Sequence, residues 1–362
     1  MNTRFNVRKK VLGNLTPVRL AAKNGKTVEV AQTGTGSPDT GSQKRRGRSS
    51  RRSSRVSPPT TTAPIALDTL IFGQTGIMAA HLLAGNRPAL IDTGPANTAD
   101  NVIEARAELG ITTLDSIILT HAHYDHAGGA GRIAEHFPEA TVYAHKGAAR
   151  YLADPSLLAD SVEVWDGKAG ELFGTPTAIP ISRITALSDG ATVDIGWRRL
   201  QAFETPGHTR SHMVFLDLET DAMICGDALG IQLPGSRIIR PSTPPSDCTH
   251  QEAIASIEKM RGYAPASVHL AHFGESGQPP EETFDRAIVA INDWHDSFIK
   301  KSEMAESEEE LLRSVNACVE ATLEPVPPSV RRGFEAVNPT WLNIAGMANE
   351  QKHRPDDFAD AV

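Results

Sequence analysis

The chain has 362 residues, of which 40% are apolar, and a formal net charge of −8. This length and composition suffice for one large domain with a hydrophobic core, and no apolar run reaches the ~18 residues of a membrane span. The three dispersed cysteines, Cys225, Cys248 and Cys318, are too few for a disulfide framework and favour a reducing compartment. We therefore expect a cytoplasmic protein without a membrane span.

The first 63 residues differ in composition from the rest of the chain. They contain fourteen Lys or Arg and two Asp or Glu, a net charge of +12, which leaves −20 for residues 64–362. The run 44–55 is rich in Arg and Ser and has no periodic apolar face, so residues 1–63 are predicted to be a disordered basic arm. We prefer a dispensable solvated tail to a nucleic-acid or membrane contact, and organelle targeting by the arm stays open.

After the arm, the pattern predicts alternating strands and helices. The first elements expected are a hairpin over 68–72 and 78–83, a strand over 88–91, and a helix over 97–109 that stops at Gly110. The strand over 88–91 runs into an Asp-Thr-Gly turn. Asp92 in this turn is expected to fix the loop or to orient a nearby ligand rather than to bind metal itself.

Four potential metal ligands lie within six residues after the apolar run 117–119, namely His121, His123, Asp125 and His126. His121 and His123 are two residues apart, which places them on one side of an extended or looped backbone but not of a helix. The following residues are small and then helix-forming, so Asp125 and His126 should fall at a helix start. This density of ligands predicts a loop that follows a strand and serves two metal ions.

Residues 150–185 have no strong periodicity but contain Trp165, Leu172 and Phe173 among Pro and Gly. A long insertion of this kind is either a lid or pocket wall, or a plain surface excursion. A second irregular segment, residues 231–245, is too rich in proline for a central strand and is a candidate lining of a substrate channel.

Three later segments repeat the arrangement of a strand followed by a ligand. Residues 200–205 precede His208, residues 222–225 precede Asp227, and residues 267–271 precede His272. Because loops converge at one edge of an α/β sheet, we expect these side chains to join the first cluster. Five histidines and two aspartates then suffice for two metals with one shared carboxylate and room for water. Cys225 is expected to be a buried core thiol.

From residue 281 the pattern turns helical. Apolar residues recur every three or four positions over 281–301 and 307–323, prolines interrupt at 325–328, and 329–349 is expected to form a closing helical pair. The predicted organisation is an arm over 1–63, a catalytic domain over 64–280 and a C-terminal helical region over 281–362.

In their order and spacing, these motifs resemble the metallo-β-lactamase-fold superfamily, and its glyoxalase II-like hydrolases more than the antibiotic-degrading lactamases. The resemblance covers about residues 64–296. It rests on H-x-H-x-D-H at 121–126, T-P-G-H-T-x-x-H at 205–212, Gly226-Asp227, the final His272, and Ile91-Asp-Thr-Gly94. It implies an α/β fold, a four-layer αββα sandwich with a C-terminal helical appendage.

The resemblance also implies a distribution of the ligands. One metal would lie on His121, His123 and His208, the second on Asp125, His126 and His272, with Asp227 bridging. The chain departs from the family pattern at Arg210 and Ser211, where smaller or less polar residues are usual. Arg210 either faces the site and attracts an anionic substrate or is a solvated loop charge. His212 is expected to support the site rather than to bind metal.

The charge of such a centre indicates its chemistry. Two divalent cations, two carboxylates and one hydroxide leave a net charge of about +1, which favours an anionic acyl substrate. A metal lowers the pKa of bound water to about 7, and Asp125 is the expected catalytic residue that orients the hydroxide and carries a proton. The sequence therefore predicts a dinuclear hydrolase that cleaves a thioester, ester or lactone by metal-bound hydroxide. The two divalent ions would be zinc, or else iron or manganese.

Three alternatives stay open. The first two are enzymes, a mononuclear-iron sulfur dioxygenase of the same fold and a phosphodiesterase. The third is a metal-binding, nucleic-acid-associated protein that uses its basic arm, although a small-molecule partner is expected rather than nucleic acid. The sequence is also compatible with a homodimer.

Overall fold

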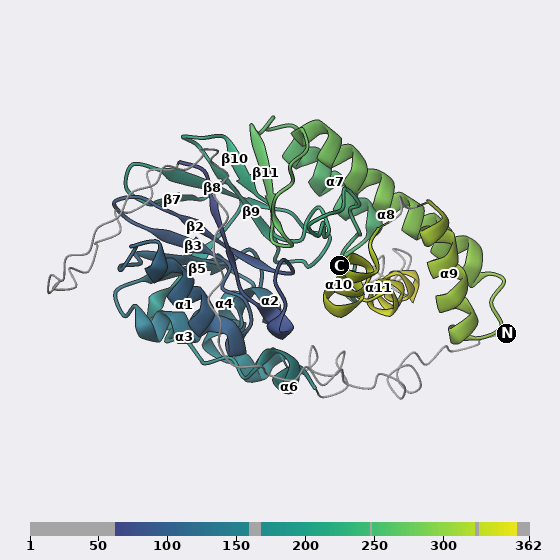
Figure 1. Ribbon diagram of the computed structural model, residues 1–362, viewed down its shortest axis with the longest axis horizontal. Coiled ribbons are helices and arrows are strands. Elements are labelled where there is room, and N and C mark those ends of the chain that lie inside the picture. Colours follow the sequence, from purple (N-terminus) through teal and green to yellow (C-terminus); the bar gives the residue numbers. More distant parts are fainter. Residues whose placement is uncertain (1–61, 159–167, 247, 323–325, 353–362) are drawn as a thin grey trace, which may run out of the picture.

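The computed structural model describes residues 62–158, 168–246, 248–322 and 326–352. The predictions for almost all of the basic arm and for Trp165 lie outside these residues. Two six-stranded sheets face each other, and helices cover the outer face of each sheet (Figure 1). Among the described residues, no helix is both long and apolar enough to cross a membrane.

The first sheet has the strand order β1-β2-β3-β4-β5-β6. Its strands are β1 (Ile65–Asp68), β2 (Ala79–Leu83), β3 (Ala89–Ile91), β4 (Ser116–Ile118), β5 (Thr141–His145) and β6 (Ile184–Leu187). The first three pair antiparallel and β3 to β6 pair parallel. The helices α1 (Ala99–Glu108) and α3 (Ala130–His136) cover its outer face, where Val102 and Ile133 pack in one buried cluster with Ile117.

The second sheet has the order β12-β11-β10-β9-β8-β7. Its strands are β7 (Thr192–Asp194), β8 (Arg199–Glu204), β9 (Met213–Asp217), β10 (Ala222–Ile224), β11 (Ser267–Leu270) and β12 (Gly274–Glu275). The helices α7 (His250–Arg261) and α8 (Pro280–Ser302) cover its outer face through Ile257 and Phe284, which pack with Met223. Thr249 and Glu252 form a capping box that fixes the start of α7.

The inner faces of the two sheets share a separate apolar core. Ile91 and Ile118 of the first sheet pack there with Phe215 and Ile224 of the second. Ile117, the neighbour of Ile118 in β4, packs under the outer helices instead, as expected for a strand that is covered on both sides. The predicted four-layer αββα sandwich is confirmed.

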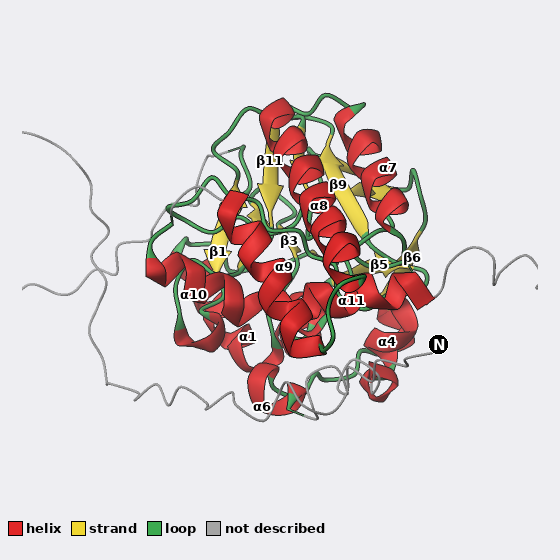
Figure 2. Cartoon of the chain, turned by 90° about the vertical axis from the view of Figure 1, so that its right-hand side faces the viewer, coloured by secondary structure: helices red, strands yellow, loops and turns green. Residues whose placement is uncertain are grey.

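The C-terminal helical region is also confirmed. It begins with α8 and continues with α9 (Glu308–Thr322), α10 (Pro328–Val337) and α11 (Thr340–Lys352), which agree with the expected bounds within a few residues. Figure 2 views this region face-on, in front of the sheets. Trp294 and Phe298 of α8 pack with Val315 of α9 and with Ile344 and Met347 of α11. A single buried cluster therefore fastens the last helices to α8.

The expected hairpin is wrong in its first strand, which ends at Asp68 rather than beginning there. The carboxylate of Asp68 accepts hydrogen bonds from the backbone N–H groups of Leu70 and Gly76. Leu70 and Phe72 adopt positive φ angles of 57° and 55°, which a strand does not allow. Residues Ile71–Gly73 form a 3-10 turn instead. A hairpin is present, but residues 65–68 rather than 68–72 pair with residues 79–82.

The remaining short helices connect the strands. They are α2 (Tyr124–Ala127), α4 (Ala149–Ala153) and α6 (Ala169–Phe173), with 3-10 turns at Ala96–Thr98, Pro155–Leu158 and Ile181–Arg183. The insertion over 150–185 contributes Phe173 to a buried cluster with Tyr124 of α2 and Phe334 of α10. The described part of this insertion is thus packed against the domain.

Candidate metal centre

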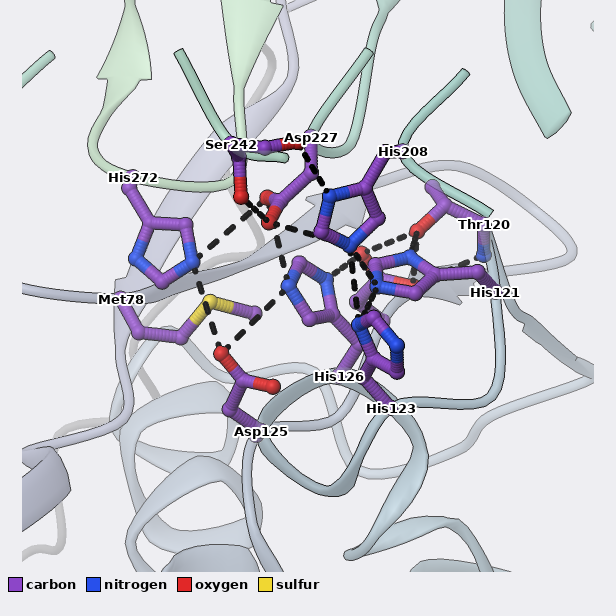
Figure 3. A network of polar contacts seen from close by, with 12 residues as sticks. Met78, Thr120, His121, His123, Asp125, His126, His208, Asp227, Ser242 and His272 are labelled. Atoms are coloured by element: carbon purple, nitrogen blue, oxygen red, sulfur yellow. Dashed lines mark hydrogen bonds and ion pairs between the residues drawn. The ribbon is translucent and has the colours of Figure 1, made fainter. Parts of the chain in front are cut away.

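The seven predicted ligands lie together at one edge of the two sheets (Figure 3). The loops after β4, β8, β10 and β11 supply them, because each of these strands ends at the same edge of the sandwich. His121, His126, His208, Asp227 and His272 are all buried. His123 and Asp125 are half-buried, so they form the more accessible side of the cluster.

Three imidazole nitrogens form the first group. The His121 Nε2 lies 3.0 Å from His123 Nδ1 and 3.1 Å from His208 Nε2, and His123 Nδ1 lies 2.8 Å from His208 Nε2. Three nitrogens bound to one tetrahedral zinc at ~2.0–2.1 Å would be about 3.3 Å apart. Burial and neighbouring histidines hold the pKa of His121 and of His123 well below its usual value. These rings are therefore neutral, as metal binding requires.

The second group combines imidazole and carboxylate. Asp125 Oδ2 lies 3.7 Å from His126 Nε2 and 3.6 Å from His272 Nε2. Asp227 lies between the groups, since its Oδ1 is 3.3 Å from His126 Nε2 and 3.6 Å from His272 Nε2, while its Oδ2 is 3.6 Å from His208 Nε2. One carboxylate of Asp227 thus presents an oxygen to each group.

Hydrogen bonds to the ring nitrogens that face away from the cluster determine which nitrogens point into it. The Nδ1 atoms of His208 and His272 donate to the carbonyl oxygens of Ser242 and Ile77, at 2.9 and 2.7 Å. With Nδ1 bonded to a carbonyl, each of these rings directs its Nε2 into the cluster. In the described part of the chain, His126 Nε2, His272 Nε2 and Asp227 Oδ1 are buried without a hydrogen-bond partner. Converging nitrogen and oxygen atoms of this kind could hold a cation.

The electrostatics of the second group favour positive charge. Burial alone would lower the pKa of His126, but the carboxylates of Asp227, Asp125 and Asp92 raise it well above its usual value. Burial would raise the pKa of Asp227, but His126, His272 and His208 hold it well below. Asp227 is thus ionised, and a metal ion would compete with a proton for His126 Nε2.

Asp92 supports the ligand loop, as its position in the Asp-Thr-Gly turn predicts. Its Oδ1 accepts hydrogen bonds from the backbone N–H and hydroxyl of Thr120, at 2.9 and 3.0 Å, and its Oδ2 lies 2.9 Å from His126 Nδ1. The φ of Asp92 is +58°, a conformation that costs energy for a non-glycine residue. Asp92 thus joins the loop after β3 to the loop after β4 and orients His126.

His212 supports Asp227 from the opposite side. Its Nε2 accepts a hydrogen bond of 3.1 Å from the backbone N–H of Asp227, and its Nδ1 lies 2.9 Å from the hydroxyl of Thr205. Both nitrogens are occupied, so the structure places His212 beside the ligands rather than among them. Gly226 makes this contact possible: its φ is +50°, and a β-carbon there would lie 2.7 Å from His212 Nε2.

The family model for the metallo-beta-lactamase superfamily matches residues 77–272, more than half of the chain. The chain belongs to the metallo-β-lactamase superfamily. It is 32% identical over 211 residues to the uncharacterized protein YobT of Bacillus subtilis, a match that covers 56% of this chain and 85% of that protein. It is 28% identical over 144 residues to a hydroxyacylglutathione hydrolase of Francisella philomiragia, covering 40% of this chain and 44% of that enzyme.

A solved structure shows the same fold. The archaeal superfamily protein ST1585 from Sulfolobus tokodaii superposes with a TM-score of 0.57 at 20% identity, covering 79% of this chain and 97% of that chain. A metallo-beta-lactamase family protein from Thermus thermophilus, TTHA1429, gives 0.54 at 18% identity, covering 78% and 89% of the two chains. Both matches extend beyond the family-model region and so include part of the surrounding helices.

Arg210, the candidate substrate contact of this superfamily member, lies at the surface beside α7. Its guanidinium forms an ion pair with Glu252 of the capping box, and about half of its side chain is exposed. Burial acts to raise the pKa of Glu252, but the Arg210 guanidinium and the Thr249 N–H lower it below its usual value. The ion pair identifies a partner within the chain for Arg210, and the contact of Arg210 with substrate stays a prediction.

Cys225 is buried in the core as expected, and burial raises the pKa of its thiol.

Two residues beside the ligands are not predicted from the sequence. Ser242 accepts from His208 Nδ1 through its carbonyl and donates to Asp227 Oδ2 from its hydroxyl, at 2.9 and 3.2 Å. Met78 lies beside Asp125 and His272 (Figure 3) and is fully buried. Backbone carbonyls carry no residue signature, so the role of Ser242 has no signal in the sequence beyond its place in the proline-rich segment after Asp227.

Proposed function

We propose that this superfamily member is a dinuclear metal-dependent hydrolase that cleaves a thioester, ester or lactone. The observation that carries the proposal is the position of Asp227, whose two oxygens face two separate groups of inward-pointing ligands. A single-metal site would need only one of these groups. The mixture of five imidazoles and two carboxylates suits zinc, with iron or manganese as alternatives.

Two divalent ions in this site would lower the pKa of a bound water and polarise the carbonyl of a substrate. The contribution of the protein is to fix the ligands and to manage the proton. Asp125 is the more exposed of the two ligand carboxylates, with 19% of its side chain accessible against 5% for Asp227. We assign to Asp125 the catalytic role of orienting the attacking water and accepting its proton.

The charge of the site and the named relatives support the proposed substrate class. The two ligand carboxylates carry fewer negative charges than the positive charges of two divalent cations. The loaded site would therefore have a net positive charge and would attract an anionic acyl substrate. The similarity to proteins named hydroxyacylglutathione hydrolases supports an acyl substrate of this kind. We further infer that residues 64–280 form the catalytic domain and that residues 281–362 complete it.

Metal analysis combined with a hydrolysis panel tests the proposal. We expect about two metal ions per chain and turnover of a thioester, ester or lactone that disappears on chelation and returns with added metal. Phosphodiesters and β-lactams belong in the same panel as competing substrate classes. One iron per chain with oxygen uptake and no hydrolysis, or cleavage confined to phosphodiesters, would contradict it.

A further inference from the structure

Two buried asparagines of the C-terminal region form an amide relay, defined here as Asn338 and Asn343. Asn338 is 2% exposed and Asn343 is 0% exposed. Asn343 Nδ2 donates to Asn338 Oδ1 at 2.7 Å, and Asn338 Nδ2 donates to the carbonyl of Pro241 at 2.8 Å. Asn343 Oδ1 accepts from the backbone N–H and the hydroxyl of Thr243, at 2.7 and 3.0 Å. The relay therefore holds the chain at Pro241 and again at Thr243.

Ser242, which lies between these two anchor points, contacts the metal centre directly. Its carbonyl accepts from His208 Nδ1 and its hydroxyl donates to Asp227 Oδ2. His208 belongs to the first group of the cluster, and Asp227 faces both groups. A shift of Ser242 would thus move the histidine of one group and the shared carboxylate together.

Further contacts leave the segment around Ser242 little freedom. Arg240 is 5% exposed, donates to the carbonyl of Asn338 at 3.0 Å and to Glu335 at 2.6 Å, and lies over the ring of Phe334. On the other side, α11 approaches so closely that a β-carbon on Gly346 would clash with the carbonyl of Thr243. Only a glycine permits this contact between the helix and the loop.

We propose that Asn338 and Asn343 are positioning residues for the metal centre, which act through Ser242 on His208 and Asp227. The proposal rests on the metal site described under the proposed function. Groups that orient metal ligands commonly change metal affinity by 10–100-fold when they are removed. A helix whose Asn343 lies 100 residues after Thr243 in the sequence would therefore set how tightly the site holds its ions.

Asn343→Ala tests the relay, with Asn349→Ala as a matched control. Asn349 lies on the same helix and donates to the carbonyl of Ser246, just after the irregular segment, and among the described residues it forms no hydrogen bond with residues 241–243. Zinc affinity would be measured by competition with a chelator, and folding by urea unfolding of the metal-free proteins. We expect Asn343→Ala to weaken zinc binding about 10-fold or more, and Asn349→Ala to leave zinc affinity within about twofold of wild type.

Wild-type zinc affinity in Asn343→Ala would overturn the proposal, as would an equal loss in both variants, which would indicate a general effect of helix docking. If Asn343→Ala shows no cooperative unfolding, the Thr243→Val variant tests the proposal instead. It removes only the hydroxyl that donates to Asn343 and keeps the hydrogen bond from the Thr243 backbone N–H. We expect that variant to weaken zinc binding about threefold or more, and unchanged affinity contradicts the relay. A wild-type protein that binds no metal would instead refute the proposed function.

Discussion

Four of the five ligand imidazoles are held by hydrogen bonds on the nitrogen that faces away from the centre. The partners are the Thr120 hydroxyl for His121, Asp92 for His126, the Ser242 carbonyl for His208 and the Ile77 carbonyl for His272. Such bonds fix both the tautomer and the orientation of a ring before metal arrives. The fold therefore orients these four rings, and an ion bound at the proposed site would require little rearrangement.

Asp125→Asn keeps the shape of the side chain but removes a negative charge from the second group. We expect a folded protein that binds about one metal, because His121, His123 and His208 are unchanged, and that loses about 10²-fold or more in turnover. Steady-state kinetics with metal analysis measures both effects. Asp100→Asn, which removes an exposed carboxylate paired with Arg132, is the control and should behave as wild type. Two bound metals with near-normal turnover would refute the role of Asp125.

Asp227→Ala removes the carboxylate that faces both groups of ligands. We expect metal content and turnover to fall together, because the two like-charged ions lose the negative charge between them. Metal content after gel filtration and kcat with added metal would be compared with wild type. Full metal content with lost activity would argue against a bridging position for Asp227.

At the scale of elements, the strands that carry ligands could be predicted because each combines an apolar run with a ligand after its end. This pattern assigns His208, Asp227 and His272 to the site, and the structure brings them together. The turn after β1 could not be predicted, since it depends on the carboxylate of Asp68 and on positive φ angles. The support from Ser242 and Asn343 was equally hidden, because hydrogen bonds between distant segments leave no periodic pattern.

Two histidines meet between the sheets, outside the ligand set. His81 of β2 and His269 of β11 lie in an edge-to-face arrangement with ring centroids 5.9 Å apart. Among the described residues, neither nitrogen of His81 has a hydrogen-bond partner. Burial, with the charges of His269 and His126, lowers the pKa of His81 from 6.5 to about 3, and burial lowers the pKa of His269 to about 4. Both rings are neutral in the folded protein.

Lowered pKa values make these histidines acid-sensitive. Between the unfolded value of 6.5 and about 3, the unfolded chain binds a proton at His81 that the folded chain does not, so stability falls as the pH falls through this window. His81→Leu should reduce the loss of stability between about pH 7.5 and about pH 5 by about 2 kcal/mol. Urea unfolding of metal-free protein measures it, with the exposed His136→Leu as control. The same pH dependence in His81→Leu and wild type would contradict this account.

The whole molecule combines two regions of opposite charge, +12 over residues 1–63 and −20 over the remainder. Because the arm sequence has no periodic apolar face, deletion of residues 1–60 should leave the melting temperature and kcat/KM nearly unchanged. The deletion ends before Thr62, whose carbonyl accepts a hydrogen bond from Arg198. Thermal unfolding and kinetics at matched ionic strength provide the test. A large drop in melting temperature would show that the arm docks on the folded domain.

The ligands of the centre come from both halves of the sandwich. The loop over 121–126 extends from the first sheet, whereas His208, Asp227 and His272 extend from the second. Bound ions would therefore link the two sheets at this edge of the sandwich. Each tenfold rise in free metal above the dissociation constant would add about 1.4 kcal/mol per ion to the free energy of unfolding. The lifetime of the folded chain would then follow the metal supply of its surroundings.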